Sequence, residues 1–429
     1  MSWNLEFENA HCHTYYSNPL TLPDSTISIE DYAKTYRDRN MHCLVCSEHG
    51  YRGNVWAQAD IAKKYSKGDY QMKAICAAET YFVPDRNPDL KDGRNFHLLL
   101  IAKDNEGFRQ LNKILSESQV SGYYRAGRVD FELLSQLDYR HFIATTACVG
   151  GVLKDEHGER LACQLAEIFR ENFRLEIQYH NNDVQIAHNL KVLNLYKKYK
   201  WPLFFATDSH YIDPEDKLLR KELQLSSKIE MDDGDWLLYL PTAEDAYKQL
   251  EAQKIFSKAQ IEESFENTLQ LREFEGFSYT SERKFPISRP ELTIEQRNRL
   301  YKQMVCNGYI EKAGMPSKEE AAELHSEMDT IVDTNSADYF IGLHDMLKRG
   351  QELGGILTTT SRGSACGFAS NFALGFTSIN RLRCPVKMYP DRFISKAKLE
   401  SGSMPDIDSN ITNVEAFEQA GREIFGDRK

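Results

Sequence analysis

The sequence predicts an α/β protein, and two observations support that fold class. In the first 210 residues, short apolar runs typical of strands alternate with helical patterns. Such alternation is typical of strands joined by helical crossovers. Most of these runs also end in His, Asp, Glu or Cys. Because the carboxyl ends of parallel strands meet on one face of an α/β barrel, we expect these side chains to converge there.

The expected elements follow one another in a regular order. The strand-like runs are 5–11, 42–49, 73–79, 95–102, 141–148, 173–180 and 202–210. The helical patterns that fill most of the gaps are 28–39, 54–65, 105–116, 160–171 and 184–200. Strand, helix and strand in repetition predict parallel strands, so we expect a barrel-like α/β domain.

Beyond residue 210 the pattern changes. Residues 213–285 are helical and charged, and a proline-punctuated stretch at 284–290 is typical of an inter-domain linker. We therefore expect one domain over 1–285 and a second over 286–429. In the second, the expected elements are helices at 291–314, 317–333 and 336–352 and a strand at 354–360.

Composition narrows the class of protein. The 429-residue chain has a formal net charge of −11, which argues against simple polyanion binding but not against an enzyme that meets phosphates through metal ions. Its start lacks the basic and apolar blocks of a signal peptide, and no apolar run is long enough to span a bilayer. We expect a cytoplasmic protein with no membrane partner. Cys43 and Cys46, three residues apart in an apolar run, would face opposite sides of a strand and so not chelate one ion.

A set of strand-end side chains suggests a metal centre. His11 and His13 alternate with Cys12, so both would project from one side of a strand. Later strand ends add similar residues, giving the candidate set His11, His13, Asp24, His49, Glu79, His97, Cys148, Asp208 and His210. Singly, each has a structural reading, such as a packed histidine, a buried thiol or a helix cap. Together they exceed the needs of one ion, so we expect two or three divalent ions, zinc with manganese or iron as alternatives. Phosphodiester or phosphomonoester hydrolysis is the reaction class that such clustered ions serve.

A second group lies near the C-terminus. The run Arg-Gly-Ser-Ala-Cys-Gly at 362–367 opens an expected helix through Phe376, where small residues and a helix start favour a phosphate group. Asp406 and Asp408 would share one face of a strand, a spacing that suits two Mg2+ ions in nucleotidyl transfer. Without further context, an acidic surface turn after Pro405 is the favoured reading of the two aspartates.

The motifs of the first domain resemble those of the polymerase-and-histidinol-phosphatase (PHP) domain. They are His-Cys-His-Thr-Tyr-Tyr-Ser at 11–17, Ser-Glu-His-Gly at 47–50, Ala-Glu-Thr-Tyr at 78–81, the run 96–102, Ala-Thr-Thr-Ala-Cys-Val-Gly-Gly at 144–151 and Ala-Thr-Asp-Ser-His-Tyr at 206–211. The resemblance implies a distorted (β/α)7 barrel in which the nine candidates bind three metal ions. Glu48 stands where the family usually has Asp, and the loop before Asp24 departs from the family pattern.

The C-terminal motifs resemble the palm of C-family replicative DNA polymerases, the bacterial DNA polymerase III alpha subunits. The matching runs are Arg-Gly-Ser-Ala at 362–365, Ala-Leu-Gly-Phe at 373–376, Asp-Arg-Phe at 391–393 and Ser-Met-Pro-Asp-Ile-Asp at 403–408. The resemblance implies an α+β partial palm. In it Arg362, Gly363, Ser364 and Arg392 would contact the incoming dNTP, and Asp406 and Asp408 would hold catalytic Mg2+.

In that family the third catalytic aspartate, the thumb and the fingers lie further along the chain. We therefore expect the N-terminal portion of a DNA polymerase that acts on DNA with a second polypeptide supplying the rest. The PHP site is expected to carry out 3′–5′ exonucleolytic hydrolysis. Two alternatives stay open, a stand-alone PHP nuclease or phosphoesterase and a non-catalytic piece that docks replisome proteins.

Overall fold

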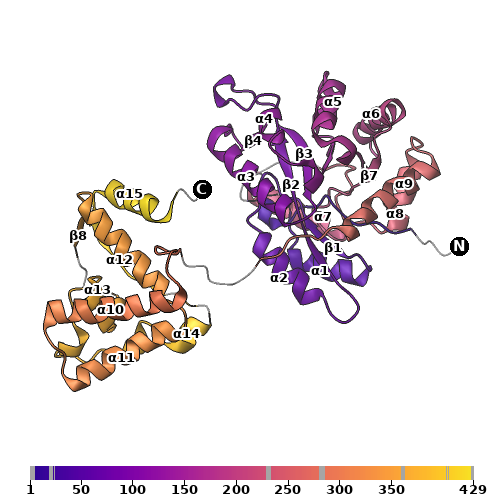
Figure 1. Cartoon of the computed structure of the whole chain (residues 1–429). Coiled ribbons are helices and arrows are strands. Elements are labelled where there is room, and N and C mark those ends of the chain that lie inside the picture. The colour runs from indigo at the N-terminus through magenta and orange to yellow at the C-terminus, as the bar shows by residue number, and fades with distance from the viewer. Residues whose placement is uncertain are drawn as a thin grey trace. The chain divides into compact units, whose positions relative to one another are not determined.

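The computed structural model describes residues 5–18, 23, 25–228, 233–279, 286–358, 363–401, 403 and 405–426. The chain divides into two compact units, Met1–Tyr279 and Thr280–Lys429 (Figure 1). In the described ranges, no helix is both long and apolar enough to span a membrane.

The first unit is built on one curled sheet. Its strands are β1 (Cys43–Cys46), β2 (Lys73–Phe82), β3 (Phe96–Ala102), β4 (Arg128–Val129), β5 (Phe142–Thr145), β6 (Phe173–Ile177) and β7 (Leu203–Phe205). They lie in the order β1-β2-β3-β5-β6-β7, with β4 beside β2. This mixed α/β arrangement is consistent with a PHP domain.

The expectation of uniformly parallel strands is wrong at β3. This strand runs antiparallel to both β2 and β5, whereas β1–β2, β5–β6 and β6–β7 are parallel. The connection from β2 to β3 contains only a short 3-10 helix, Pro88–Leu90, and parallel neighbours need a longer helical crossover. His97, the second residue of β3, therefore reaches the carboxyl edge of the parallel strands from the start of its own strand.

The expected strand at 5–11 is also not formed among the described residues. Cys12 makes an isolated parallel bridge to Ser209, and its carbonyl accepts a hydrogen bond from the Ser47 amide at 3.0 Å. Further back, the Glu8 carboxylate accepts from the backbone amides of His42 and Cys43, at 2.9 and 2.9 Å. The Glu8 side chain thus accepts the hydrogen bonds that backbone carbonyls would accept in a regular β-sheet. The N-terminal segment therefore lies between the ends of β1 and β7, and its described residues form no strand.

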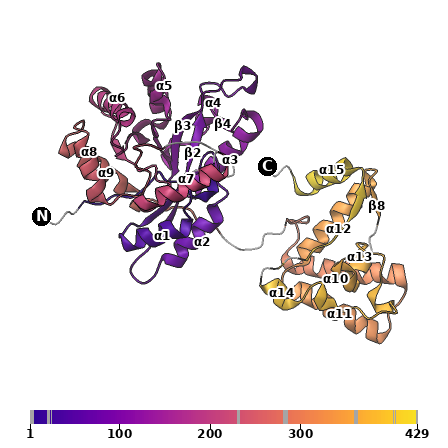
Figure 2. The same ribbon diagram turned by 180° about the vertical axis from the view of Figure 1, so that it is seen from behind.

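Helices surround the sheet (Figure 2). They are α1 (Ile29–Asp38), α2 (Val55–Tyr65), α3 (Asn105–Ser121), α4 (Phe131–Leu134), α5 (Gly158–Phe169), α6 (Asp183–Tyr199), α7 (Lys217–Ser226), α8 (Ala243–Ala252) and α9 (Lys258–Leu269). Ser28, Asp104 and Asn182 cap the N-termini of α1, α3 and α6 with side-chain oxygens. These caps explain why those helices begin close to the expected positions.

Strand alternation separates two apolar layers. The inner face of the sheet forms a small buried cluster with the segment after α9, made of Ala10, Cys43, Val45, Ile75, Ala77, Leu99, Ile101, Ile143, Ala147, Phe204, Leu271 and Phe274. The outer face packs against the helices in a larger cluster that includes Cys46. Cys43 and Cys46 therefore lie on opposite faces, as their spacing predicts. Leu271 and Phe274 complete this inner apolar cluster. The polar side chains lie away from it, at the carboxyl ends of the parallel strands.

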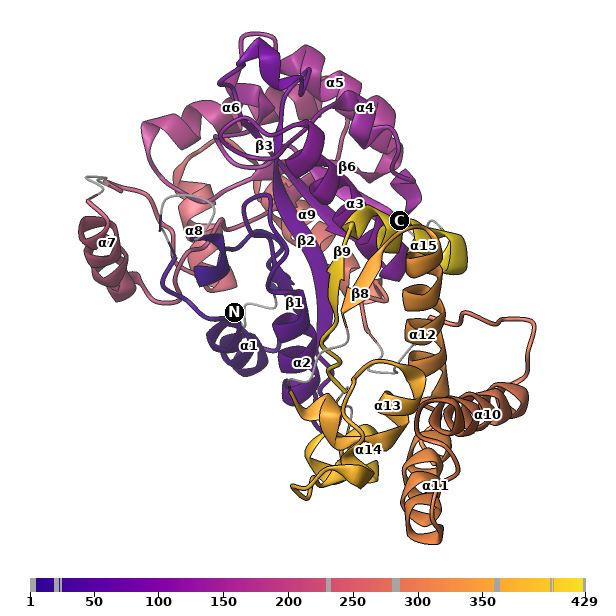
Figure 3. The ribbon, with the colours of Figure 1, turned by 90° about the vertical axis from the view of Figure 1, so that its left-hand side faces the viewer.

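The second unit is mainly helical. Its helices are α10 (Ile294–Ala313), α11 (Lys318–Asp333), α12 (Ala337–Glu352), α13 (Ala369–Leu374), α14 (Lys396–Glu400) and α15 (Val414–Phe425). A two-stranded antiparallel ribbon, β8 (Ile356–Thr358) and β9 (Asn410–Thr412), lies beside α12 and α15 (Figure 3). Phe417 of α15 packs so closely on α12 that a Cβ at Gly350 would lie 2.2 Å from its ring.

A buried carboxylate organises the middle of this unit. Glu327 of α11 accepts hydrogen bonds from the Ala369 and Ser370 amides at 3.0 and 2.9 Å and from Arg381 Nε at 2.6 Å. It therefore caps the start of α13, where unpaired amides favour an anion. The expected single helix through Phe376 is instead a 3-10 turn, Ser364–Gly367, followed by α13, because Glu327 begins the helix at Ala369 and Gly375, at φ +87°, ends it.

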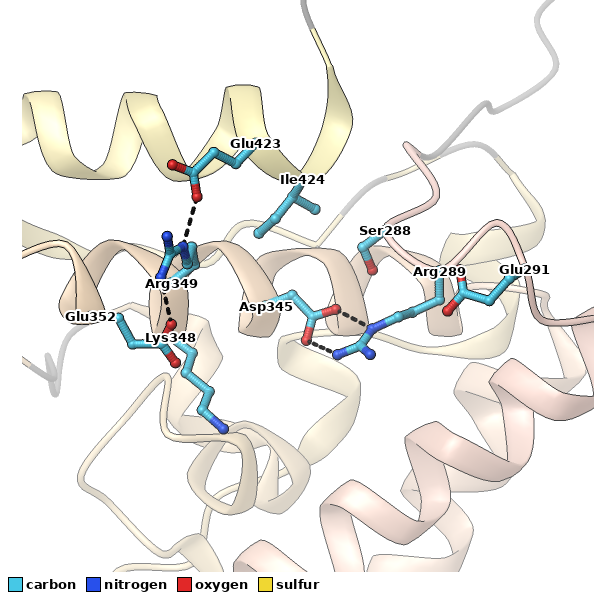
Figure 4. A pocket seen from close by; sticks show the side chains of 9 residues that line it. All are labelled: Ser288, Arg289, Glu291, Asp345, Lys348, Arg349, Glu352, Glu423 and Ile424. Carbon is cyan, nitrogen blue, oxygen red and sulfur yellow. Dashed lines mark hydrogen bonds and ion pairs between the residues drawn. The ribbon is translucent and has the colours of Figure 1, made fainter.

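A charged pocket of about 420 Å³ lies between α12, α15 and residues 288–291 (Figure 4). Its charges pair across it: Arg289 forms a fork to Asp345 at 2.9 and 3.1 Å, and Arg349 contacts Glu423 at 2.7 Å. These pairs link residues 288–291 to α12 and link α12 to α15, so the pocket is read as a structural contact region.

Candidate metal centre

The carboxyl edge of the first sheet holds a dense group of imidazoles and carboxylates. Among the residues that the structure describes, three sets have ligand atoms that all lie within 4.8 Å of one another, namely His11–His13–Asp208, His13–His49–His210 and His49–Glu79–His97. Seven of the nine candidate ligands are in these sets. Asp24 lies outside the described residues, and Cys148 adjoins the third set.

Glu79 is at the middle of the cluster. Its Oε1 lies 3.1 Å from His11 Nε2 and 2.8 Å from His97 Nδ1. Its Oε2 lies 2.8 Å from His49 Nδ1 and 3.6 Å from His13 Nε2. Donors about 2.1 Å from one tetrahedral ion lie about 3.4 Å from each other, so both oxygens face donors at chelating distances. The two oxygens therefore face two different pairs of imidazoles, so Glu79 could ligate more than one divalent ion.

Asp208 and Cys148 extend the group on either side. Asp208 Oδ1 lies 3.2 Å from His13 Nε2 and 3.5 Å from His11 Nε2. Cys148 Sγ lies 3.3 Å from His97 Nδ1, on the Oε1 side of Glu79. Asp208 has φ +50°, a left-handed backbone conformation that is uncommon outside glycine and recurs at functional sites.

A buried network sets the tautomer of His11. Its Nδ1 lies 2.8 Å from Glu176 Oε1, and Glu176 also accepts from Thr145 Oγ1 at 2.5 Å and Gln178 Nε2 at 2.8 Å. Because a carboxylate only accepts, Nδ1 carries a proton, and Nε2, which faces Glu79 and Asp208, is the nitrogen that a bound metal ion would take. Carboxylate–histidine pairs of this kind orient metal ligands.

His13 is oriented by a second relay. Ser17 Oγ donates to Glu48, so it accepts the proton of His13 Nδ1 at 3.2 Å. Glu48 also accepts from Thr14 Oγ1 at 2.6 Å and Asn54 Nδ2 at 2.9 Å. Glu48 thus acts through His13, away from the cluster. The substitution of Glu for the usual Asp at this position is accommodated by these partners.

The electrostatics of Glu79 and His13 match a ligand role, whereas, despite burial, nearby carboxylates raise the pKa of His11, and burial raises that of Cys148. Burial opposes ionisation of Glu79, but His97 and His11 hold its pKa well below the ordinary value. Burial and the neighbouring His49 lower the pKa of His13 to about 3, so its imidazole is neutral at neutral pH. His11 Nε2, His13 Nε2 and Glu79 Oε2 are buried, with no hydrogen-bond partner of suitable geometry among the described residues. Buried polar atoms are rarely left so, and bound divalent ions would satisfy all three.

Three further side chains of this region are not among the sequence candidates. Glu176 and Ser17 position ligands without being ligands, and His180 ends the run that follows β6. A usable signal for two of them was the alternation of polar residues at 176, 178 and 180 in an otherwise apolar strand.

The candidates of the second unit are less enclosed. Gly363 has φ +75°, and a Cβ there would lie 3.0 Å from Asp408 Oδ2, so the Gly-Ser turn and this carboxylate adjoin. Ser364 begins the 3-10 turn. Arg392 is exposed at the end of Pro390–Arg392, a turn that contacts Ser364–Gly367. Arg362 lies outside the described residues.

The expectation that Asp406 and Asp408 lie on a strand is wrong. Both belong to a non-strand segment that precedes β9, because pairing with β8 begins only at Asn410. Asp406 is exposed and Asp408 is half-buried. Tyr339 of α12 contacts this segment, because its hydroxyl donates a hydrogen bond to the Pro405 carbonyl at 3.1 Å.

Comparison with known families agrees with these two regions. Residues 9–180 match the PHP domain, and residues 293–428 match the bacterial DNA polymerase III alpha NTPase domain. Asp208 and His210 lie beyond the first match, and the structure brings them to the same cluster. The chain thus combines a PHP domain with a DNA polymerase III alpha domain.

Related proteins cover nearly the whole chain. DNA polymerase III subunit alpha of Aquifex aeolicus (strain VF5) is 27% identical over 94% of this chain and 36% of the relative. The Helicobacter pylori (strain ATCC 700392 / 26695) subunit is 25% identical over 96% of the chain and 36% of the relative. A probable DNA polymerase, YorL, of Bacillus subtilis (strain 168) is 24% identical over 98% and 38%. The chain is homologous to the N-terminal region of DNA polymerase III alpha subunits and spans little more than a third of their length.

Proposed function

We propose that the first unit hydrolyses phosphodiester bonds at the 3′ end of DNA, using two or three divalent ions. The observation that carries this proposal is the Glu79 carboxylate, buried between four imidazoles that approach its two oxygens in pairs. Zinc, manganese and iron all suit a donor set of imidazole, carboxylate and thiolate.

The donor geometry suggests how the ligands divide. His11, His97 and Cys148 would share an ion on the Oε1 side of Glu79, and His13 and His49 would share one on the Oε2 side. Asp208 with His210 would complete the second ion, and Asp24, which lies outside the described residues, is a candidate ligand by the family resemblance alone. Bound divalent ions supply Lewis acidity toward phosphoryl oxygens and lower the pKa of coordinated water.

The chain's own groups prepare the site for that chemistry. Glu176 and the Ser17–Glu48 relay hold the protons of His11 and His13 on Nδ1, so Nε2 stays available. The full burial of His11 and His13 excludes water from the ligand side. In such a water-poor setting, electrostatic interactions with a phosphate group are stronger than in bulk solvent.

For the second unit we propose the N-terminal part of a C-family palm. Gly363, Ser364, Arg362 and Arg392 would contact the triphosphate of a dNTP, and Asp406 and Asp408 would hold Mg2+. A second polypeptide would supply the third aspartate, the fingers and the thumb. The close approach of Gly363 to Asp408 supports a shared site. The domain limits 1–285 and 286–429 belong to this proposal.

One experiment separates the two sites. The metal-loaded chain is incubated with a 5′-labelled single-stranded DNA, and shortened products are resolved on a sequencing gel. His13→Ala should abolish 3′–5′ shortening, and Asp406→Ala should leave it unchanged. The reverse result would show that hydrolysis belongs to the second unit and that this proposal is wrong.

A further inference from the structure

His180 is a buried histidine at the rim of the metal cluster that the proposed reaction leaves unused. It follows β6 on the same side as Glu176 and Gln178, because residues two apart along extended chain face one way. Glu176 contacts His11, and Gln178 contacts Glu176. His180, two residues beyond Gln178, therefore lies further toward the carboxyl edge of the sheet, where the cluster is.

A backbone contact decides which nitrogen of His180 carries its proton. The Leu237 amide donates to His180 Nδ1 at 3.2 Å, so Nδ1 has the lone pair. A neutral imidazole has one N–H group, which must then be on Nε2. Nε2 is consequently a donor and not a metal ligand, in contrast to the Nε2 atoms of His11 and His13.

The donor is buried and has no acceptor. His180 is 0% exposed, and Nε2 has no hydrogen-bond partner among the described residues. Burial lowers the pKa of His180 to about 4, so the ring stays neutral at neutral pH. An orphan N–H of this kind costs stability, which an acceptor brought by a ligand would recover.

The segment that fixes His180 also fixes a candidate ligand. The Leu238 carbonyl accepts from the His210 amide at 2.8 Å, one residue after the amide that binds His180. Trp236 packs edge-on against the His180 ring, with centroids 5.0 Å apart. Residues 236–238 therefore contact both His180 and the candidate ligand His210, which places the His180 ring near the rim of the cluster.

The geometry points to His180 as a substrate-binding residue that donates its Nε2–H to a non-bridging oxygen of the phosphate bound at the metal cluster. This inference rests on the proposed function of that site. The ligand chemistry is a phosphate monoanion or dianion, whether inorganic, the product nucleotide or the scissile group of DNA.

The test measures phosphate binding and metal content of the 429-residue chain. His180→Phe removes the N–H but keeps an aromatic ring against Trp236, and His180→Gln keeps a donor of similar reach. His188→Phe is the matched control, because His188 is also buried with an unpartnered Nε2, on α6. After metal reconstitution, elemental analysis counts the ions, and titration calorimetry with inorganic phosphate gives the affinity.

We expect His180→Phe to keep its ions and to bind phosphate about 10- to 100-fold more weakly, the effect of one hydrogen bond to a charged group. His180→Gln should recover part of the loss, and His188→Phe should match the unaltered protein. Unchanged phosphate affinity in His180→Phe, or the loss of an ion, would overturn the inference.

A measurement on the unaltered protein covers a failure of His180→Phe to fold. With 15N-labelled histidine, the His180 Nε2–H signal should shift on addition of phosphate, and an unmoved signal would also overturn the inference. A chain that binds phosphate through His180 but never shortens DNA would contradict the proposed reaction and leave this assignment standing.

Discussion

The two candidate sites of this chain differ in how completely the folded protein encloses them. In the first unit, the side chains of His11, His13 and Glu79 are at most 1% exposed, and buried carboxylates fix the histidine tautomers. In the second unit, Asp406 is exposed, Asp408 is half-buried and both lie outside any strand. The first unit alone therefore brings the candidate metal ligands together. We expect the site at Asp406 and Asp408 to depend on further groups from a partner polypeptide. The following changes test that contrast.

The largest expected effect is the loss of ions when Glu79 is removed. Glu79→Ala deletes a carboxylate that contacts four imidazoles, so more than one ion should be lost together with hydrolysis. Elemental analysis after manganese or zinc loading should find two or three ions in the unaltered chain. Asp406→Ala should match it. Fewer than one ion per unaltered chain would contradict the prediction that the first unit binds two or three ions.

The second prediction concerns DNA synthesis by the open site. The 429 residues alone should not extend a primer, because two aspartates without positioned partners lose several powers of ten in rate. A gel assay of primer extension should detect synthesis only when a polypeptide with the downstream half is added. Asp408→Ala should then abolish it. Templated extension by the chain alone would show that the open site is complete.

A smaller effect is expected from the carboxylate behind His11. Glu176→Gln alters the partner of Nδ1 without touching a ligand atom, and such changes cost about 10- to 100-fold in metal affinity. Competition with a fluorescent chelator measures this affinity. Glu327→Gln is the control, because Glu327 is an equally buried carboxylate in the other unit. It should lower the melting temperature but not metal affinity, and equal metal affinity in both variants would remove Glu176 from the site.

The smallest effect is expected at the glycine beside Asp408. Gly363→Ala places a Cβ 3.0 Å from Asp408 Oδ2 on a backbone with φ +75°. The strain is about 1–3 kcal/mol, because φ +75° with ψ −177° is a conformation nearly confined to glycine, and the carboxylate must shift. Gly354→Ala is the matched control, with φ +90° and open space around the added Cβ. Only Gly363→Ala should slow synthesis by the completed enzyme, and neither should change hydrolysis. Equal rates in the two variants would separate Gly363 from Asp408.

The sequence located most strands and helices of the first unit because periodicity reports burial along the chain. It missed the antiparallel direction of β3, since apolar alternation is the same in both directions. The convergence of His97 with Glu79 nevertheless followed, because the start of an antiparallel strand and the ends of its neighbours share one edge. Glu176 was missed for a different reason: its role depends on a contact with His11, 165 residues away.

The N-terminal segment that bears His11 and His13 has a consequence for the order of folding. Asn9 Nδ2 donates to Ser209 Oγ across 200 residues of sequence, so residues made before most of the unit are placed only after a late part of that unit exists. At about 5–20 residues per second, a ribosome takes roughly 10–40 s to cover that interval. During this time β1 and β2 can pair, whereas the segment with His11 and His13 still lacks its partner at Ser209. The two histidines would therefore join Glu79 in a late, non-local step of folding, the kind of step that high contact order slows.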